Sequence, residues 1–130
     1  MILALRTDKP EAELYLIDSS GHEVSKHAWE AHRQLAATLV ETIQAFLQDN
    51  DLEASKLTGL IIFPGAGSFT GLRIGTTVAN ALAYSHLLPI ASGEGEEWIA
   101  DGLTRLQDAQ SGQYVIPKYD KEPNITKPKA

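Results

Sequence analysis

The apolar residues of the chain follow two different periods, and these periods predict its strands and helices. Short apolar runs predict strands at 1–5, 12–18, 22–27, 57–63 and 88–91. Apolar residues three and four apart predict helices at 31–48, 72–86 and 98–106. Turn residues at 18–21 make the first strands an antiparallel meander. The pattern therefore predicts an α/β fold with the order β-β-β-α-β-α-β-α.

Two features within this pattern concern the surfaces of the first two predicted helices. The first helix has a wide apolar face, which predicts that much of its circumference is buried: Leu35, Ala36, Leu39, Val40, Ile43, Phe46 and Leu47. The second carries a ridge of small residues at four-residue intervals: Gly71, Gly75, Ala79 and Ala83. Such a ridge allows close packing, either against the chain's own sheet or against a helix of a partner.

The composition changes after residue 110, where proline and lysine replace large apolar side chains. We therefore expect one domain at 1–110, followed by an extended C-terminal tail at 111–130. Eleven Lys and Arg against seventeen Asp and Glu give a net charge of -6, so we expect any nucleic acid to be held by a partner. The chain has no cysteine, no apolar run of membrane-spanning length and no signal-peptide pattern, which together predict a cytoplasmic protein without disulfides.

Residues 65–75 read Gly-Ala-Gly-Ser-Phe-Thr-Gly-Leu-Arg-Ile-Gly and form a glycine-dense turn between a strand and a helix. Glycine permits positive φ and close backbone approach, and Ser68 or Thr70 can cap the helix that follows. The start of a helix can bind an anion through its free N–H groups. Arg73 in the first helical turn could bind an anion or a partner carboxylate, or it could be a solvated charge.

Comparison with motifs of known chemistry argues against a catalytic site. The turn lacks the Lys-Ser or Lys-Thr pair of a P-loop, and Thr70 stands where the dinucleotide motif needs its third glycine. The residues around Ser68 do not form a nucleophile elbow, and the four histidines lack the spacing of metal ligands. The glutamates at 94, 96 and 97 fit the charged first turn of the third helix. We expect no metal, no cofactor and no catalytic residue.

The glycine-dense segment resembles the hallmark of the TsaB (YeaZ) proteins, subunits of the bacterial tRNA threonylcarbamoyladenosine machinery. That hallmark reads G-P-G-S-F-T-G-L-R-I-G, and the chain departs from it only at Ala66. The matching residues are Gly65, Gly67, Ser68, Phe69, Thr70, Gly71, Leu72, Arg73, Ile74 and Gly75. The opening strand, His32 before the first helix and Asp51-Leu52 before the fourth strand extend the resemblance over about residues 1–107.

The resemblance implies a single actin-like (ASKHA), ribonuclease H-like domain with a mixed five-stranded sheet. It also implies a non-catalytic subunit that pairs with a TsaD-like catalytic subunit, on which a TsaE-like ATPase docks, in modifying the adenosine beside the anticodon of certain tRNAs. The tRNA would be contacted only indirectly. The residues expected at the partner interface are His32, Leu35, Leu39, Gly71, Arg73, Gly75, Ala79 and Ala83.

Two departures from the family pattern weigh against an ATPase. The chain has Arg6 where the family usually has an acidic residue, and an arginine can neither hold Mg²⁺ nor act as a base. The second domain of the longer relatives is absent, although residues 114–129 look like the C-terminal tail of the family, so we expect an internal deletion. Two other hypotheses stay open: an actin-like enzyme that binds nucleotide or phosphate at the turn, and a homodimer that buries the same helix face.

Overall fold

The computed structural model describes residues 1–67 and 69–118, and of residues 32 and 69 the backbone only. Within this part the strands are β1 (Ile2–Arg6), β2 (Glu11–Ile17), β3 (Glu23–Glu30), β4 (Gly59–Ile62) and β5 (Ile90–Ser92). The α-helices are α1 (Leu35–Asp49), α2 (Phe69–His86) and α3 (Trp98–Leu106), and short 3₁₀ helices occur at η1 (His32–Gln34) and η2 (Ala54–Lys56).

The strands form one mixed sheet in the order β3-β2-β1-β4-β5. β1 pairs antiparallel with β2, and β2 with β3, whereas β1–β4 and β4–β5 are parallel. The two parallel pairs are joined through the crossover helices α1 and α2, as parallel strands require. The predicted α/β fold, its element order and its mixed five-stranded sheet are confirmed.

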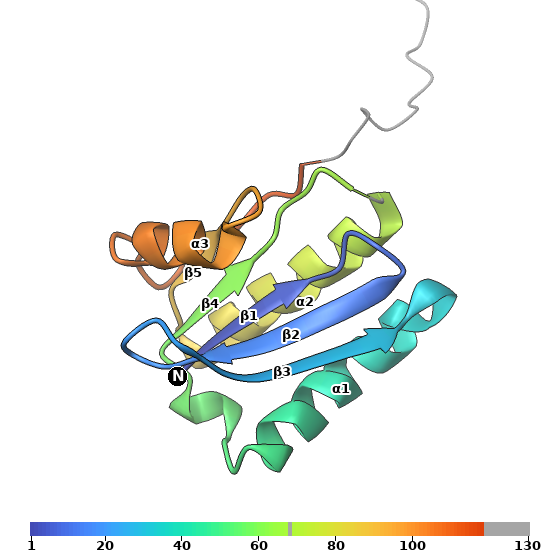
Figure 1. The fold of residues 1–130 in the computed structure, drawn as a ribbon. Helices are drawn as coiled ribbons and strands as arrows, with labels where there is room; N and C mark the ends of the chain where they lie inside the picture. Colours follow the sequence, from blue (N-terminus) through green and yellow to red (C-terminus); the bar gives the residue numbers. More distant parts are fainter. Residues whose placement is uncertain (68, 119–130) are drawn as a thin grey trace, which may run out of the picture.

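The helices cover the two faces of the sheet unequally (Figure 1). α1 and α2 lie on one face, where Leu3, Leu5 and Leu60 pack with the apolar sides of both helices. α3 lies on the opposite face, where Trp98 packs with Ala4 and Ile61. The alternation of strand side chains thus separates two cores, and the larger one lies under α1 and α2.

Several predicted boundaries shift in the structure. β3 continues to Glu30, and α2 begins at Phe69 instead of residue 72. Thr70 is therefore the second residue of the helix and cannot be its N-cap, while the capping prediction for residue 68 lies outside the described residues. Residues 111–118 form no helix or strand, and the rest of the predicted tail, 119–130, also lies outside them.

The helix α2 approaches the end of β1 unusually closely. The Thr7 hydroxyl donates a hydrogen bond of 2.8 Å to the Gly71 carbonyl oxygen. A Cβ on Gly75, one turn later, would overlap the Thr7 side chain, which is itself buried. The start of α2 thus packs on β1 through glycine backbone, and the small ridge predicted from the sequence faces the chain's own sheet.

We expect Gly75→Leu to lower the free energy of unfolding by about 2 kcal/mol or more, because the new side chain must displace Thr7 from a filled core. The matched control is Ala81→Leu on the exposed side of the same helix, for which we expect a change within about 0.5 kcal/mol. Urea denaturation followed by circular dichroism measures both. A Gly75→Leu protein as stable as the parent would contradict the close packing of α2 on β1.

Candidate functional site

The glycine-dense turn and the first loop meet at one edge of the sheet. Because β1 and β4 are parallel neighbours, the residues that follow them lie side by side. A Cβ on Gly67 would approach the Asp8 Cβ to 2.5 Å. Gly65 has a φ of +126°, in the region that favours glycine, and a Cβ there would overlap the Lys118 carbonyl. These glycines therefore let the turn pack against other backbone.

Arg6 and Asp8 form a bidentate ion pair at this edge. The Arg6 Nε lies 2.7 Å from Asp8 Oδ1, and its second nitrogen lies 3.0 Å from Oδ2. The guanidinium carbon also lies 4.0 Å from the centre of the Phe63 ring. Burial lowers the pKa of Arg6, but the hydrogen bonds and charge of Asp8 raise it more, so the net pKa lies above its ordinary value. The carboxylate of the first loop is thus bound by an internal cation.

A second polar group lies on β2, beside this ion pair. The buried Glu13 carboxylate accepts a hydrogen bond from the Tyr15 hydroxyl, and Lys9 Nζ lies 2.7 Å from its other oxygen. Burial raises the pKa of Glu13, but its bonds to Lys9 and Tyr15 and the charge of Lys26 lower it more, so the net pKa is lowered. Burial and the bond to Glu13 raise the pKa of the Tyr15 hydroxyl. Both groups keep their ordinary charge at neutral pH.

Most of the residues predicted at the partner interface lie inside the domain. The buried ones belong to the apolar side of α1 and the small ridge of α2: Leu35, Leu39, Gly75, Ala79 and Ala83. Gly71 is half-buried, and the side chain of residue 32 lies outside the described residues. Arg73 is exposed and makes no ion pair with any residue of the described part. This placement favours internal packing, the alternative that the sequence left open for the ridge.

The surface that α1 and α2 turn away from the sheet nevertheless carries exposed apolar side chains among polar ones. Val40 is 50% exposed and Tyr84 is 78% exposed. We call this surface the outer helix face and define it by Ala36, Val40, Ile74, Val78, Ala81 and Tyr84. The sequence assigned Ala36 and Val40 to the buried side of α1, which is wrong. The width of the apolar face could have indicated this exposure. A helix that packs on one sheet cannot bury both edges of so wide an apolar face.

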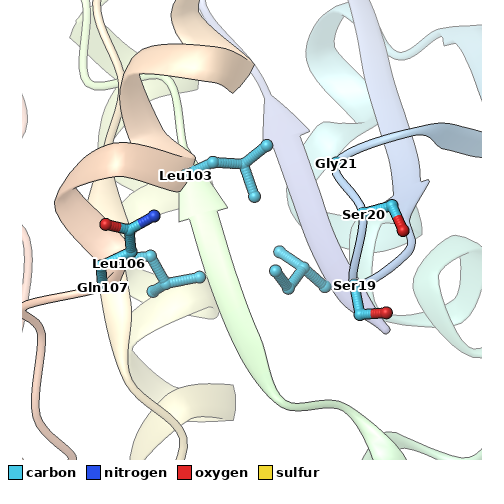
Figure 2. Close-up of a pocket in the computed structure, with 7 residues that line it drawn as sticks. Ser19, Ser20, Gly21, Leu103, Leu106 and Gln107 are labelled. Atoms are coloured by element: carbon cyan, nitrogen blue, oxygen red, sulfur yellow. The ribbon is translucent and has the colours of Figure 1, made fainter.

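A different hollow lies between α3 and the turn that joins β2 to β3, at the opposite end of the sheet from the glycine-dense turn. Figure 2 shows this cavity of about 370 Å³, with Leu103 and Leu106 of α3 on one side and Ser19 to Gly21 on the other. None of the residues predicted as a site lines it. Its lining mixes leucine and isoleucine with serine and glutamine and contains no charged group, so it has no recognisable chemistry.

Across residues 1–67 and 69–118 no three His, Asp or Glu side chains are grouped so that they could hold a metal ion. Among the helices of that same part, none has the length and apolar character needed to cross a bilayer.

Several known proteins are similar to this chain. It is 36% identical over 84 residues to the tRNA threonylcarbamoyladenosine biosynthesis protein TsaB of Bacillus subtilis (strain 168), covering 59% of the chain and 37% of that protein. YeaZ from Pseudomonas aeruginosa superposes with a TM-score of 0.64 at 25% identity, over 70% of this chain and 42% of YeaZ. A crystal structure of a Pseudomonas aeruginosa protein described as similar to peptidase YeaZ gives the same TM-score and identity, over 70% and 41%. The chain thus spans about two fifths of the length of these relatives.

The sheet order and the division of the helices between its faces define the class: a single actin-like, ribonuclease H-like domain. A family model described as TsaD, tRNA N6-adenosine threonylcarbamoyltransferase, matches residues 27–92, about half of the chain. Together with the named relatives, this match shows that the chain belongs to the TsaB (YeaZ) family, within the wider group that the TsaD model describes.

The buried Glu13 carboxylate makes stability depend on pH with a definite sign. Its folded pKa lies below the ordinary 4.5, so ionised Glu13 stabilises the fold above about pH 4.5, and this contribution is lost as the pH falls through the folded pKa. We expect Glu13→Gln to lower the free energy of unfolding at neutral pH, and the deficit to shrink between about pH 5 and pH 3. Urea denaturation over this range measures it. The exposed Glu11→Gln on the same strand is the control. A deficit independent of pH would contradict the role of the Glu13 charge.

Proposed function

We propose that this chain is a non-catalytic subunit in tRNA threonylcarbamoyladenosine biosynthesis, and that it binds a TsaD-like catalytic subunit. The name of the Bacillus subtilis relative and the description of the matching family model both support this pathway. In the proposed complex a TsaE-like ATPase joins the assembled pair, and tRNA is contacted only through the catalytic subunit.

The observation that carries the proposal is the outer helix face. Apolar side chains gathered on two adjacent helices are unfavourable in water, and such patches are typical of surfaces that bind proteins. Tyrosine is one of the residues that most often fill a pocket at the centre of an interface, as Tyr84 could, and Val40 adds exposed apolar area. A helical partner would lie along α1 and α2, where Ile74 and Val78 are half-buried and pack against the core of the domain. The interface side chains are thus the exposed neighbours of the ridge predicted from the sequence.

The first loop supports a role without catalysis. Its single carboxylate, Asp8, is held in a bidentate ion pair with Arg6 and packs against Gly67. A carboxylate that already neutralises an internal cation is a poor ligand for Mg²⁺, and displacing it would leave a half-buried guanidinium unpaired. The alternative of a nucleotide-binding enzyme at this turn therefore has less support than an interaction role.

A pair of valines with equal exposure tests the proposed interface. Val40 on α1 is 50% exposed and Val24 on β3 is 49% exposed, so a glutamate at either position starts from a similar environment. We expect Val40→Glu to weaken binding to the TsaD-like subunit of the same organism by about tenfold or more, because it buries a charge in the interface. Val24→Glu should bind like the parent. Isothermal titration calorimetry with purified proteins measures both affinities.

The results of this titration distinguish whether the chain binds a TsaD-like subunit from whether the outer helix face is the interface. If the parent chain does not bind the TsaD-like subunit at micromolar concentration, the proposed function is contradicted. If the parent binds but both variants lose affinity equally, the function stands and the outer helix face is not the interface. Light scattering of the free chain identifies the homodimer hypothesis, which predicts a mass twice that of the monomer and its loss in Val40→Glu.

A test in cells addresses the modification itself. We expect the chain, expressed with its cognate TsaD-like subunit, to restore threonylcarbamoyladenosine in tRNA of bacteria depleted of their own TsaB. Mass spectrometry of digested tRNA measures the modified nucleoside. Val24→Glu should restore it and Val40→Glu should not. Full restoration by the TsaD-like subunit alone would contradict a requirement for this chain.

A further inference from the structure

The chain after α3 returns to the other end of the sheet and lies against α2 as an extended segment. Residues 113–118 run from the middle of α2 to the glycine-dense turn. Two hydrogen bonds join Val115 to one side chain: its N–H donates to Asn80 Oδ1 at 2.9 Å, and its carbonyl accepts from Asn80 Nδ2 at 2.9 Å. A neighbouring β-strand would satisfy the same two backbone groups in the same way. The Asn80 carboxamide therefore recognises extended backbone.

The side chains of this segment alternate as they do in a strand. Val115 is half-buried and packs against the core beneath α1 and α2, and Pro117 is also half-buried. Tyr114 and Ile116 point away and are 71% and 69% exposed. The inward positions 115 and 117 thus favour a β-branched residue and a proline. The outward positions 114 and 116 can hold any residue.

The end of the segment is held by charge and by the turn. The Lys118 N–H donates a 2.5 Å hydrogen bond to the Pro64 carbonyl, and its ammonium group pairs with Glu94. Glu94 is also paired with Arg105. The sequence placed the glutamates at 94, 96 and 97 in the first turn of α3, which is wrong, because the helix begins only at Trp98. The lack of a Cβ on Gly65 makes room for the Lys118 carbonyl. We call the surface formed by Asn80, Pro64, Gly65 and Glu94 the peptide groove.

Residues 113–118 lie on the surface of the domain and are not part of its sheet. The edge strand of the sheet on this side is β5. A cavity of about 390 Å³ lies between Val115, β5 and Arg105 of α3. A segment held by a few hydrogen bonds, one exposed ion pair and the two half-buried side chains of Val115 and Pro117 belongs to the part of a fold that opens at low cost.

We propose that the peptide groove is a binding site for an extended peptide of a partner protein, with the chemistry of its present occupant: a β-branched residue, any residue, a proline and a cation. Residues 113–118 then act as a ligand in cis that the partner's peptide replaces. A tethered ligand competes at an effective concentration in the millimolar range, so free peptide must reach that range to displace it. This site lies at the β5 side of α2, and it does not depend on the proposed TsaD-like partner.

Nuclear magnetic resonance on the full chain tests the site. Val115→Asp places a charge where Val115 packs on the core and should release the segment, while every groove residue is kept. The probe is a synthetic peptide with the sequence of residues 112–118, capped at both ends. We expect it to shift the side-chain amide resonance of Asn80 in the ¹⁵N-labelled Val115→Asp chain in a saturable manner. A peptide carrying aspartate in place of the valine is the control and should cause no shift.

A second measurement covers the case in which Val115→Asp does not fold. The same peptide, spin-labelled at its N-terminus, is added to the unaltered ¹⁵N-labelled chain at millimolar concentration. We expect signal loss at α2 residues next to Asn80, and none of this loss in the Asn80→Ala chain. Absence of binding to a folded Val115→Asp chain, or of signal loss in the unaltered chain, would overturn the proposal and make residues 113–118 a fixed part of the domain.

Discussion

The contact between the end of β1 and the start of α2 is the constraint on which the other features of this domain depend. Thr7 fills the space above Gly75 and bonds to the Gly71 carbonyl, so the helix axis is fixed close to the sheet. Since α2 is held there, its inner residues Ala79 and Ala83 are sealed in the core. What remains for a partner is the outward side of the same helix. The small residues thus determine how the binding surface is presented without forming it.

The charged side chains at the same edge of the sheet form ion pairs with one another. Arg6 binds Asp8, Lys9 binds Glu13, and Tyr15 donates to the same glutamate. Groups that could have served a ligand are therefore bound to each other, and separating them would leave unpaired charge in a partly buried environment. These contacts make this edge of the sheet a structural joint of the domain. This is the physical basis for favouring an interaction role.

The two proposed surfaces adjoin on α2, where Tyr84 follows Asn80 by one helical turn, and they differ in chemistry. The outer helix face is apolar and suits a packed helical partner, which would gain from removing Val40 and Tyr84 from water. The peptide groove offers an amide, a carbonyl and a carboxylate, which suit extended backbone with a cation. One helix can therefore support two kinds of contact, because Asn80 binds extended backbone whereas Tyr84 exposes an apolar ring.

The sequence by itself determined the element order, the class of fold and the family, because strand and helix periods and the eleven-residue hallmark are local features. It also supplied the ridge of small residues, but not the surface that this ridge contacts. Only the tertiary structure decided that Gly75 faces Thr7, that Val40 is exposed and that Gly65 makes room for Lys118, 53 positions later. Each of these depends on a neighbour brought close by the sheet and not by the chain. A local pattern records which residue is small or apolar, whereas burial is fixed only when the distant segment that covers it is in place.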